Sequence, residues 1–143
     1  MTYLTIPICG KDLQSCKEQI SSAVRAGAGM LELRSDYLES LEIDKLKELM
    51  SAAKKTNLPF IVTCRDTAQG GQNNLPAPMR IQILIEAVKN GANLIDCEFK
   101  NFTGDWEIEL KKVLAEHKKT KLILSEHNFK EPFENVPAIY EEM

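Results

Sequence analysis

Short β-prone runs alternate with segments of helical periodicity along the whole chain, and this alternation limits the fold more than any other feature. The five runs that predict strands are Leu4–Cys9, Met30–Arg34, Phe60–Arg65, Leu94–Glu98 and Lys121–Glu126. Strands that recur every ~30 residues with a helix between them are typical of βαβ units, whose right-handed crossovers produce a parallel sheet. The sequence therefore predicts an α/β fold.

Polar caps and Gly or Asn residues mark the helix boundaries between these runs. Helices are predicted to begin after Asp12, at Asp44, near Pro78, near Asp105 and near Glu134. The first three end at Gly27, before Asn57 and before Gly91, and apolar positions include Val24 in the first helix and Ile108 in the fourth. No Pro- or Ser-rich linker interrupts the pattern, so we assign residues 1–143 to one domain.

Two architectures accommodate five such units. A doubly wound open sheet is complete at this length. A (β/α)8 TIM barrel needs about 250 residues, so these 143 residues would form a barrel truncated to five βα units. The residues at the strand ends favour the truncated barrel.

Charged and polar side chains lie at the ends of four predicted strands, although parallel strands that are buried on both faces should be apolar. Side chains alternate along a strand, so the pairs that share a face are Glu32 with Arg34, Thr63 with Arg65, Asp96 with Glu98, and Ser125 with His127. One interpretation is a set of buried salt bridges that ties the strands together. Each buried charge costs several kcal/mol unless it is paired or used. Four such strands in succession therefore favour an active site at the C-terminal rim of a barrel.

The two histidines have different settings. His117 is followed by two lysines at a predicted helix end, which is typical of a solvated side chain. His127 directly follows the fifth strand and has acidic neighbours. Because the pKa of histidine is close to neutral, His127 suits proton transfer to and from a substrate. Gly70-Gly71 alone predicts only a turn, since the spaced glycines and following lysine of a phosphate loop are missing.

Composition excludes several classes of protein. The net charge of −3 argues against nucleic acid as the main partner. No run has the roughly 18 apolar residues of a membrane span, and no signal peptide is visible, so we expect a cytoplasmic protein with no membrane partner. The four cysteines are far apart and lack metal-ligand spacing, so we expect reduced, mostly buried thiols and no metal site.

Four short motifs, in order and covering nearly the whole chain, resemble those of the type I 3-dehydroquinate dehydratase family. They are Glu32–Leu38 (E-x-R-x-D-x-L), Thr63–Arg65 with Gly70-Gly71 (T-x-R…E-G-G), Ile95–Glu98 (hydrophobic-D-x-E), and Leu124–Phe129 with Pro132 (S-x-H-D-F…P). The resemblance implies a TIM barrel of the shikimate pathway that converts 3-dehydroquinate to 3-dehydroshikimate and water. It also implies that no metal or cofactor takes part and that the enzyme is often a homodimer.

The resemblance further implies a lysine on the sixth strand, whose imine with the substrate ketone serves as an electron sink. His127 matches the histidine that removes the C2 proton and later protonates the leaving hydroxyl. Residues that match the other site positions are Glu32, Arg34 and Arg65 for substrate binding, and Gln69, Asp96 and Glu98 for support.

Three departures from the family pattern matter. Gln69 stands where the family usually has Glu, and the lost carboxylate should make the imidazole less basic. Pro7 replaces a residue that is polar in some members. The imine-forming lysine is expected beyond Met143, so the chain alone is expected to be inactive.

Two other readings remain at this stage. In the first, the chain is a fragment or decayed copy without activity, to which a scaffold role would also fit. In the second, it is an open-sheet, flavodoxin-like binding module. The second alternative is disfavoured, because Gly10-Lys11-Asp12 and Arg65 stand where a phosphoacceptor domain needs acidic residues.

Overall fold

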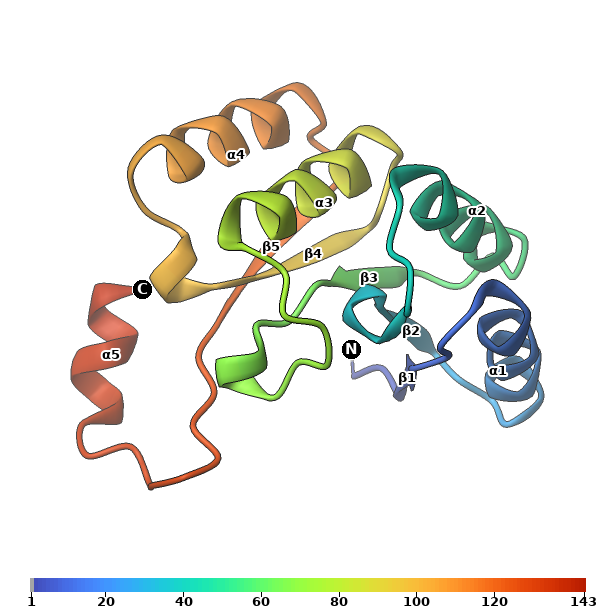
Figure 1. Cartoon of the computed structure of the whole chain (residues 1–143), viewed down its shortest axis with the longest axis horizontal. Coiled ribbons are helices and arrows are strands. Elements are labelled where there is room, and N and C mark those ends of the chain that lie inside the picture. The colour runs from blue at the N-terminus through green and yellow to red at the C-terminus, as the bar shows by residue number, and fades with distance from the viewer. Residues whose placement is uncertain (1) are drawn as a thin grey trace.

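A computed structural model describes residues 2–143 and contains one five-stranded parallel sheet (Figure 1). Its strands are β1 (Thr5–Ile8), β2 (Met30–Arg34), β3 (Phe60–Thr63), β4 (Leu94–Glu98) and β5 (Lys121–Ser125). They lie in the order β1-β2-β3-β4-β5, and each pairs in parallel with the next. The predicted α/β class is therefore confirmed.

Helices connect the strands. They are α1 (Leu13–Arg25), α2 (Ile43–Lys54), α3 (Ala77–Lys89), α4 (Gly104–Glu116) and α5 (Val136–Glu142). Three short 3-10 turns follow strands β2, β3 and β4: η1 (Ser35–Tyr37), η2 (Thr67–Gln69) and η3 (Phe99–Asn101). Within residues 2–143, no helix is both long and apolar enough to cross a membrane.

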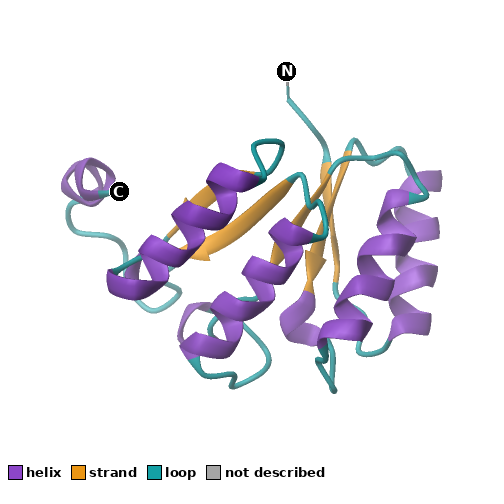
Figure 2. Cartoon of the chain, turned by 90° about the horizontal axis from the view of Figure 1, so that it is seen from above, coloured by secondary structure: helices purple, strands orange, loops and turns teal. Residues whose placement is uncertain are grey.

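The strand order distinguishes between the two candidate architectures. A doubly wound sheet reverses direction at a switch point, with strand orders such as 3-2-1-4-5. Here every crossover moves in the same direction, and right-handed crossovers of this kind place all their helices on one face. Helices α1 to α4 pack side by side over that face, whereas α5 lies apart from them (Figure 2). The described sheet is singly wound.

The core lies between the sheet and these four helices. Strand residues that face the helices are almost completely buried: Leu31, Leu33, Phe60, Val62, Ile95 and Cys97. Burying a side chain of this size contributes about 1.5–3 kcal/mol. The polar residues Glu32, Thr63 and Asp96 alternate with them and therefore share the opposite face of the sheet.

Some helix details differ from expectation. Asp12 caps α1 as predicted, and its side chain accepts a hydrogen bond from Ser15 N. Asp44 does not cap α2: the extended residue Glu42 is the N-cap, and Asp44 lies in the first turn. Ile108 is 67% exposed and Val24 43%, so neither contributes to the core as the periodicity suggested. Both lie on outer helix surfaces, where an apolar side chain is common.

Three of the four thiols, Cys16, Cys64 and Cys97, are buried, and all four are free. Burial raises the pKa of Cys64 and of Cys97 to about 12. These thiols are therefore protonated at neutral pH and pack as small apolar side chains.

Candidate active site

The C-terminal ends of β2 to β5 bring the predicted site residues to one edge of the sheet. In the strand register, Arg34 lies beside Thr63, Thr63 beside Asp96, and Glu98 beside Ser125. The third strand ends at Thr63, so Arg65 lies two residues past the end of β3, not inside it as predicted. Because parallel strands end together, this edge collects their polar residues into one layer.

Arg65 is the centre of that layer and is only 5% exposed. Its Nη1 donates to Ser125 Oγ at 2.6 Å, and its Nη2 donates to Asp96 Oδ2 at 3.0 Å. Ser125 Oγ in turn donates to Asp96 Oδ1 at 2.6 Å. The Arg65 guanidinium thus links the ends of β3, β4 and β5. Hydrogen bonds that involve a charged group are stronger than those between neutral groups.

Glu98 has a second set of partners. Its Oε1 lies 3.7 Å from Arg65 Nη1 and accepts a hydrogen bond from Asp66 N at 2.8 Å. Its Oε2 accepts from Asn101 Nδ2 at 2.9 Å. With both oxygens engaged and 3% exposure, Glu98 fixes the loop after β3. The interpretation of these charges as buried salt bridges therefore describes Glu98 well.

Glu32 and Arg34 lie on the same side of the sheet at β2. Glu32 Oε1 accepts from Thr63 Oγ1 at 2.7 Å. Arg34 makes a bidentate pair with Asp36, with its Nε and Nη2 at 2.9 and 2.8 Å from the carboxylate oxygens. Arg34 is also stacked over the ring of Tyr37. Local partners thus hold the guanidinium at the edge of the site.

His127 follows β5 and is oriented by Gln69. His127 N donates to Gln69 Oε1 at 2.9 Å, and His127 Nδ1 lies 3.2 Å from the same oxygen. An amide oxygen only accepts, so Nδ1 carries the proton of the neutral ring and the lone pair is on Nε2. Among residues 2–143, Nε2 has no hydrogen-bond partner. A free basic nitrogen of this kind can accept a proton from a substrate.

The pKa of His127 is lowered below its ordinary value. Partial burial is the main cause, because it disfavours the charged imidazolium, and the positive charge of Arg65 acts in the same direction. The carboxylates of Asp96, Glu98 and Glu126 act in the opposite direction but do not offset these effects. His127 is therefore mainly neutral at pH 7.

The glycine pair after β3 lets Gln69 reach this position. A Cβ on Gly71 would lie 2.0 Å from Arg65 O, and Gly70 has a left-handed φ of 86°. The loop therefore folds tightly against the end of β3, in a way that only glycine allows. The sequence predicted a turn here, and the close approach gives that turn a role in the site.

Several partners of the site were not anticipated from the sequence. Asp66 Oδ2 is 2.9 Å from Arg80 Nη2 and 3.0 Å from Lys100 Nζ, which anchors the loop to α3 and η3. Glu126 Oε1 accepts from Gln69 Nε2 at 2.9 Å. No spacing rule links these residues, because loop conformation decides which of them meet.

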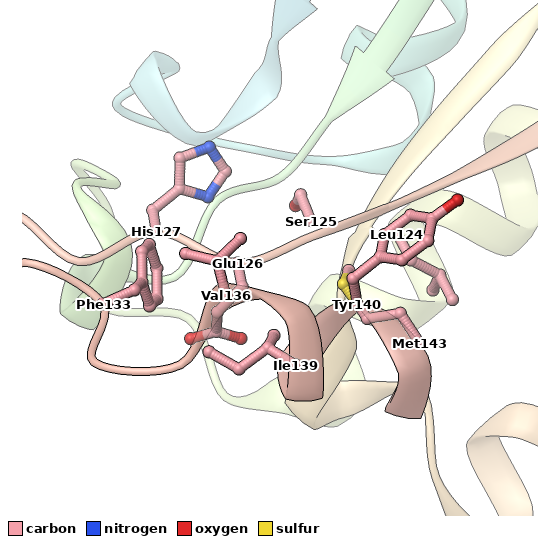
Figure 3. Close-up of a pocket in the computed structure, with 9 residues that line it drawn as sticks. All are labelled: Leu124, Ser125, Glu126, His127, Phe133, Val136, Ile139, Tyr140 and Met143. Atoms are coloured by element: carbon pink, nitrogen blue, oxygen red, sulfur yellow. The ribbon is translucent and has the colours of Figure 1, made fainter.

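A pocket of about 340 Å³ opens beside His127, between the end of β5 and α5 (Figure 3). Its lining is mostly apolar: Leu124, Phe133, Val136, Ile139, Tyr140 and Met143, with Ser125, Glu126 and His127 at one side. Arg65 and Asp96 do not line it, but Ser125, which is hydrogen-bonded to both, does, so the pocket borders the polar layer. Within residues 2–143, no group of three or more His, Cys, Asp and Glu side chains is arranged to hold a metal ion.

Comparison with known proteins gives consistent results. The family model of type I 3-dehydroquinase matches residues 4–143. The 3-dehydroquinate dehydratase of Methanosarcina mazei is 31% identical over 147 residues, which cover 99% of this chain and 58% of that protein. That of Desulfotalea psychrophila is 39% identical over 103 residues, covering 72% and 42%. The chain thus spans about half the length of the curated relatives that it matches.

Solved structures share the fold. Type I 3-dehydroquinate dehydratase from Clostridium difficile, with covalently modified comenic acid, has a TM-score of 0.81 at 22% identity, over 90% of this chain and 52% of that one. The 3-dehydroquinate dehydratase from Enterococcus faecalis has a TM-score of 0.80 at 20% identity, over 92% and 55%. Together with the family match over residues 4–143, the sequence relatives place the chain in the type I 3-dehydroquinase family.

Proposed function

We propose that this chain provides the histidine side of a 3-dehydroquinate dehydratase site, at the C-terminal rim of a TIM barrel. The proposal rests on the state of the Nε2 atom of His127. In the Nδ1–H tautomer this nitrogen carries no proton, it has no hydrogen-bond partner within residues 2–143, and it lies next to the polar layer centred on Arg65. A neutral imidazole next to fixed polar groups is the arrangement that proton abstraction from carbon requires.

In this proposal His127 removes the proton at C2 of 3-dehydroquinate and later returns a proton to the departing C1 hydroxyl. One group can serve both steps because it is fixed at the rigid end of β5 and its backbone N is held by Gln69. Its depressed pKa keeps the base form available at pH 7, and the conjugate acid is then a stronger proton donor.

The remaining residues of the layer would hold the substrate. Arg34 is paired with Asp36, and Arg65 with Asp96 and Glu98. A guanidinium has five N–H groups, so donors remain for substrate hydroxyls. Glu32 offers carboxylate oxygens beside Thr63. Asp96 and Glu98 would act as supports, since their main contacts are with Arg65 and its loop.

A Schiff-base mechanism also needs an amine at the substrate ketone. Lys100 is paired with Asp66, Lys121 begins β5 at the end opposite His127, and Lys130 lies in an exposed loop. We therefore propose that the amine comes from a segment outside residues 2–143. The singly wound sheet and its one-sided helices support a barrel in which that segment adds further strands beside β5.

A chimera tests this function. Residues 1–143 would be joined in frame to the part of the Methanosarcina mazei relative that lies beyond the matched region. The expected result is formation of 3-dehydroshikimate from 3-dehydroquinate, with no activity for the 143-residue chain alone. A folded chimera that lacks activity would contradict the proposal and would favour a decayed, scaffolding copy.

A further inference from the structure

The Gln69 side chain lies between Glu126 and His127, the two residues that follow β5. Its Oε1 accepts from both the backbone N and Nδ1 of His127, and its Nε2 donates to Glu126 Oε1. Gln69 itself is 4% exposed, so water does not substitute easily for these partners. The side chains of Glu126 and His127 leave the chain in different directions (Figure 3). The Gln69 amide contacts both of them.

The direction of the Gln69 amide decides which tautomer His127 adopts. With Oε1 toward the ring, only a protonated Nδ1 makes a favourable contact. A reversed amide would direct its NH2 group at the backbone N–H of His127 and its oxygen at the Glu126 carboxylate, so two hydrogen bonds would become two repulsive contacts. A ring beside the reversed amide would have its proton on Nε2, which could then no longer act as the base.

We propose that Glu126 is a positioning residue that acts on His127 through the amide of Gln69 and holds the ring in its Nδ1–H tautomer. The role as a positioning residue rests on the proposed function of His127 as the base. The hydrogen-bonded chain itself stands on the geometry alone.

The hydrogen bond between Gln69 and Glu126 also explains why glutamine suits position 69, beside His127. A Glu at position 69 would bring two carboxylates into contact at the 2.9 Å distance that now separates Gln69 from Glu126, which strongly disfavours ionisation of both. In this chain the Gln69 amide lies next to the His127 ring, and the Glu126 carboxylate binds the other side of that amide. The charged groups that act on His127 are then Arg65, Asp96, Glu98 and Glu126.

Nitrogen NMR of the imidazole rings tests the proposal in the 143-residue chain, without any need for catalysis. The chain has two histidines, so His117 is an internal control. Nδ1 and Nε2 give distinct signals according to which one carries the proton. We expect His127 to be entirely Nδ1–H in the native chain at a pH above its pKa, and to lose this single form in Glu126→Leu.

Glu126→Gln is the matched control. Its amide oxygen still accepts from Gln69 Nε2, so the Nδ1–H tautomer should be kept, whereas loss of the nearby negative charge should lower the pKa of His127 slightly further. The double variant Gln69→Glu/Glu126→Gln puts a carboxylate directly beside Nδ1 and should raise that pKa by about one unit.

Two results would overturn the proposal: an unchanged Nδ1–H tautomer in Glu126→Leu, or an equal loss of it in Glu126→Gln. If Glu126→Leu does not fold, Glu126→Ala decides by the same nitrogen signals, and an unchanged Nδ1–H tautomer in that variant would overturn the proposal. An inactive chimera with the expected NMR result would instead refute the function and leave the hydrogen-bonded chain in place.

Discussion

The first four βα units and the segment from β5 onward are built differently. Leu31, Leu33 and Val62, in the inner strands, are fully buried. In β5 every residue after Lys121 is only partly buried, and in α5 Val136 is 58% exposed and Tyr140 is 78% exposed. The proposed base therefore follows the least packed strand, and polar contacts to the loop after β3 hold it in place. Buried apolar side chains thus stabilise the sheet, whereas hydrogen bonds from the loop after β3 orient His127.

Loss of Arg65 should have the largest effect on stability, because it would break the link between the two regions. Arg65→Met leaves Asp96 and Glu98 buried without their cation, and removing one partner of a buried pair costs about 3–5 kcal/mol. Urea denaturation measures this difference. Arg25→Met, at an exposed position on α1, is the control and should change the free energy of unfolding by less than about 0.5 kcal/mol. Equal effects would mean that the polar layer does not stabilise the fold.

Leucine-to-alanine substitutions, one in each region, compare how much packing contributes to stability in the two regions. Leu33 and Leu122 lie on the same, helix-covered face of the sheet, but Leu33 is completely buried and Leu122 only partly. Leu33→Ala should destabilise by about 2–5 kcal/mol, and Leu122→Ala by about 1 kcal/mol. Similar losses at the two positions would show that β5 belongs to the same cooperative core.

Amide hydrogen exchange measures the difference between the two regions without any substitution. β5 is an outer strand of the described sheet, so its free side lacks a hydrogen-bonded neighbour. We expect the amides of Leu122–Leu124 to exchange about tenfold or more faster than those of Phe60–Thr63 in β3, because local opening is easier where few contacts must break. Equal protection would mean that β5 has another partner, such as a second copy of the chain.

The smallest effect concerns pH. The folded-state pKa of His127 lies below its ordinary value of 6.5. As the pH falls below about 6.5, the unfolded chain therefore binds a proton that the folded chain does not, and the free energy of unfolding decreases until the folded-state pKa is reached. His127→Gln should remove this dependence, whereas His117→Gln should leave it intact. Stability that rises toward acidic pH in this range would contradict the direction of the shift.

The sequence predicted the sheet because alternation and strand spacing are properties of the chain itself. It also predicted that Arg65, Asp96 and His127 share an edge, since parallel strands end at the same side. It did not predict that Glu126 binds Gln69 or that Arg80 binds Asp66. These contacts depend on loop paths, which short-range patterns do not determine. The cap of α2 was misplaced for a similar reason, because backbone geometry at Glu42 decides where the helix begins.

Steady-state kinetics of the chimera decide whether the loosely packed end of β5 carries the base. His127→Gln in the chimera should lower kcat by about 10²–10⁴-fold with little change in KM, since a general base acts on the transition state. His117→Gln should leave both constants unchanged. Equal kcat values for the two variants would contradict the account, because the proton would then be removed by another group.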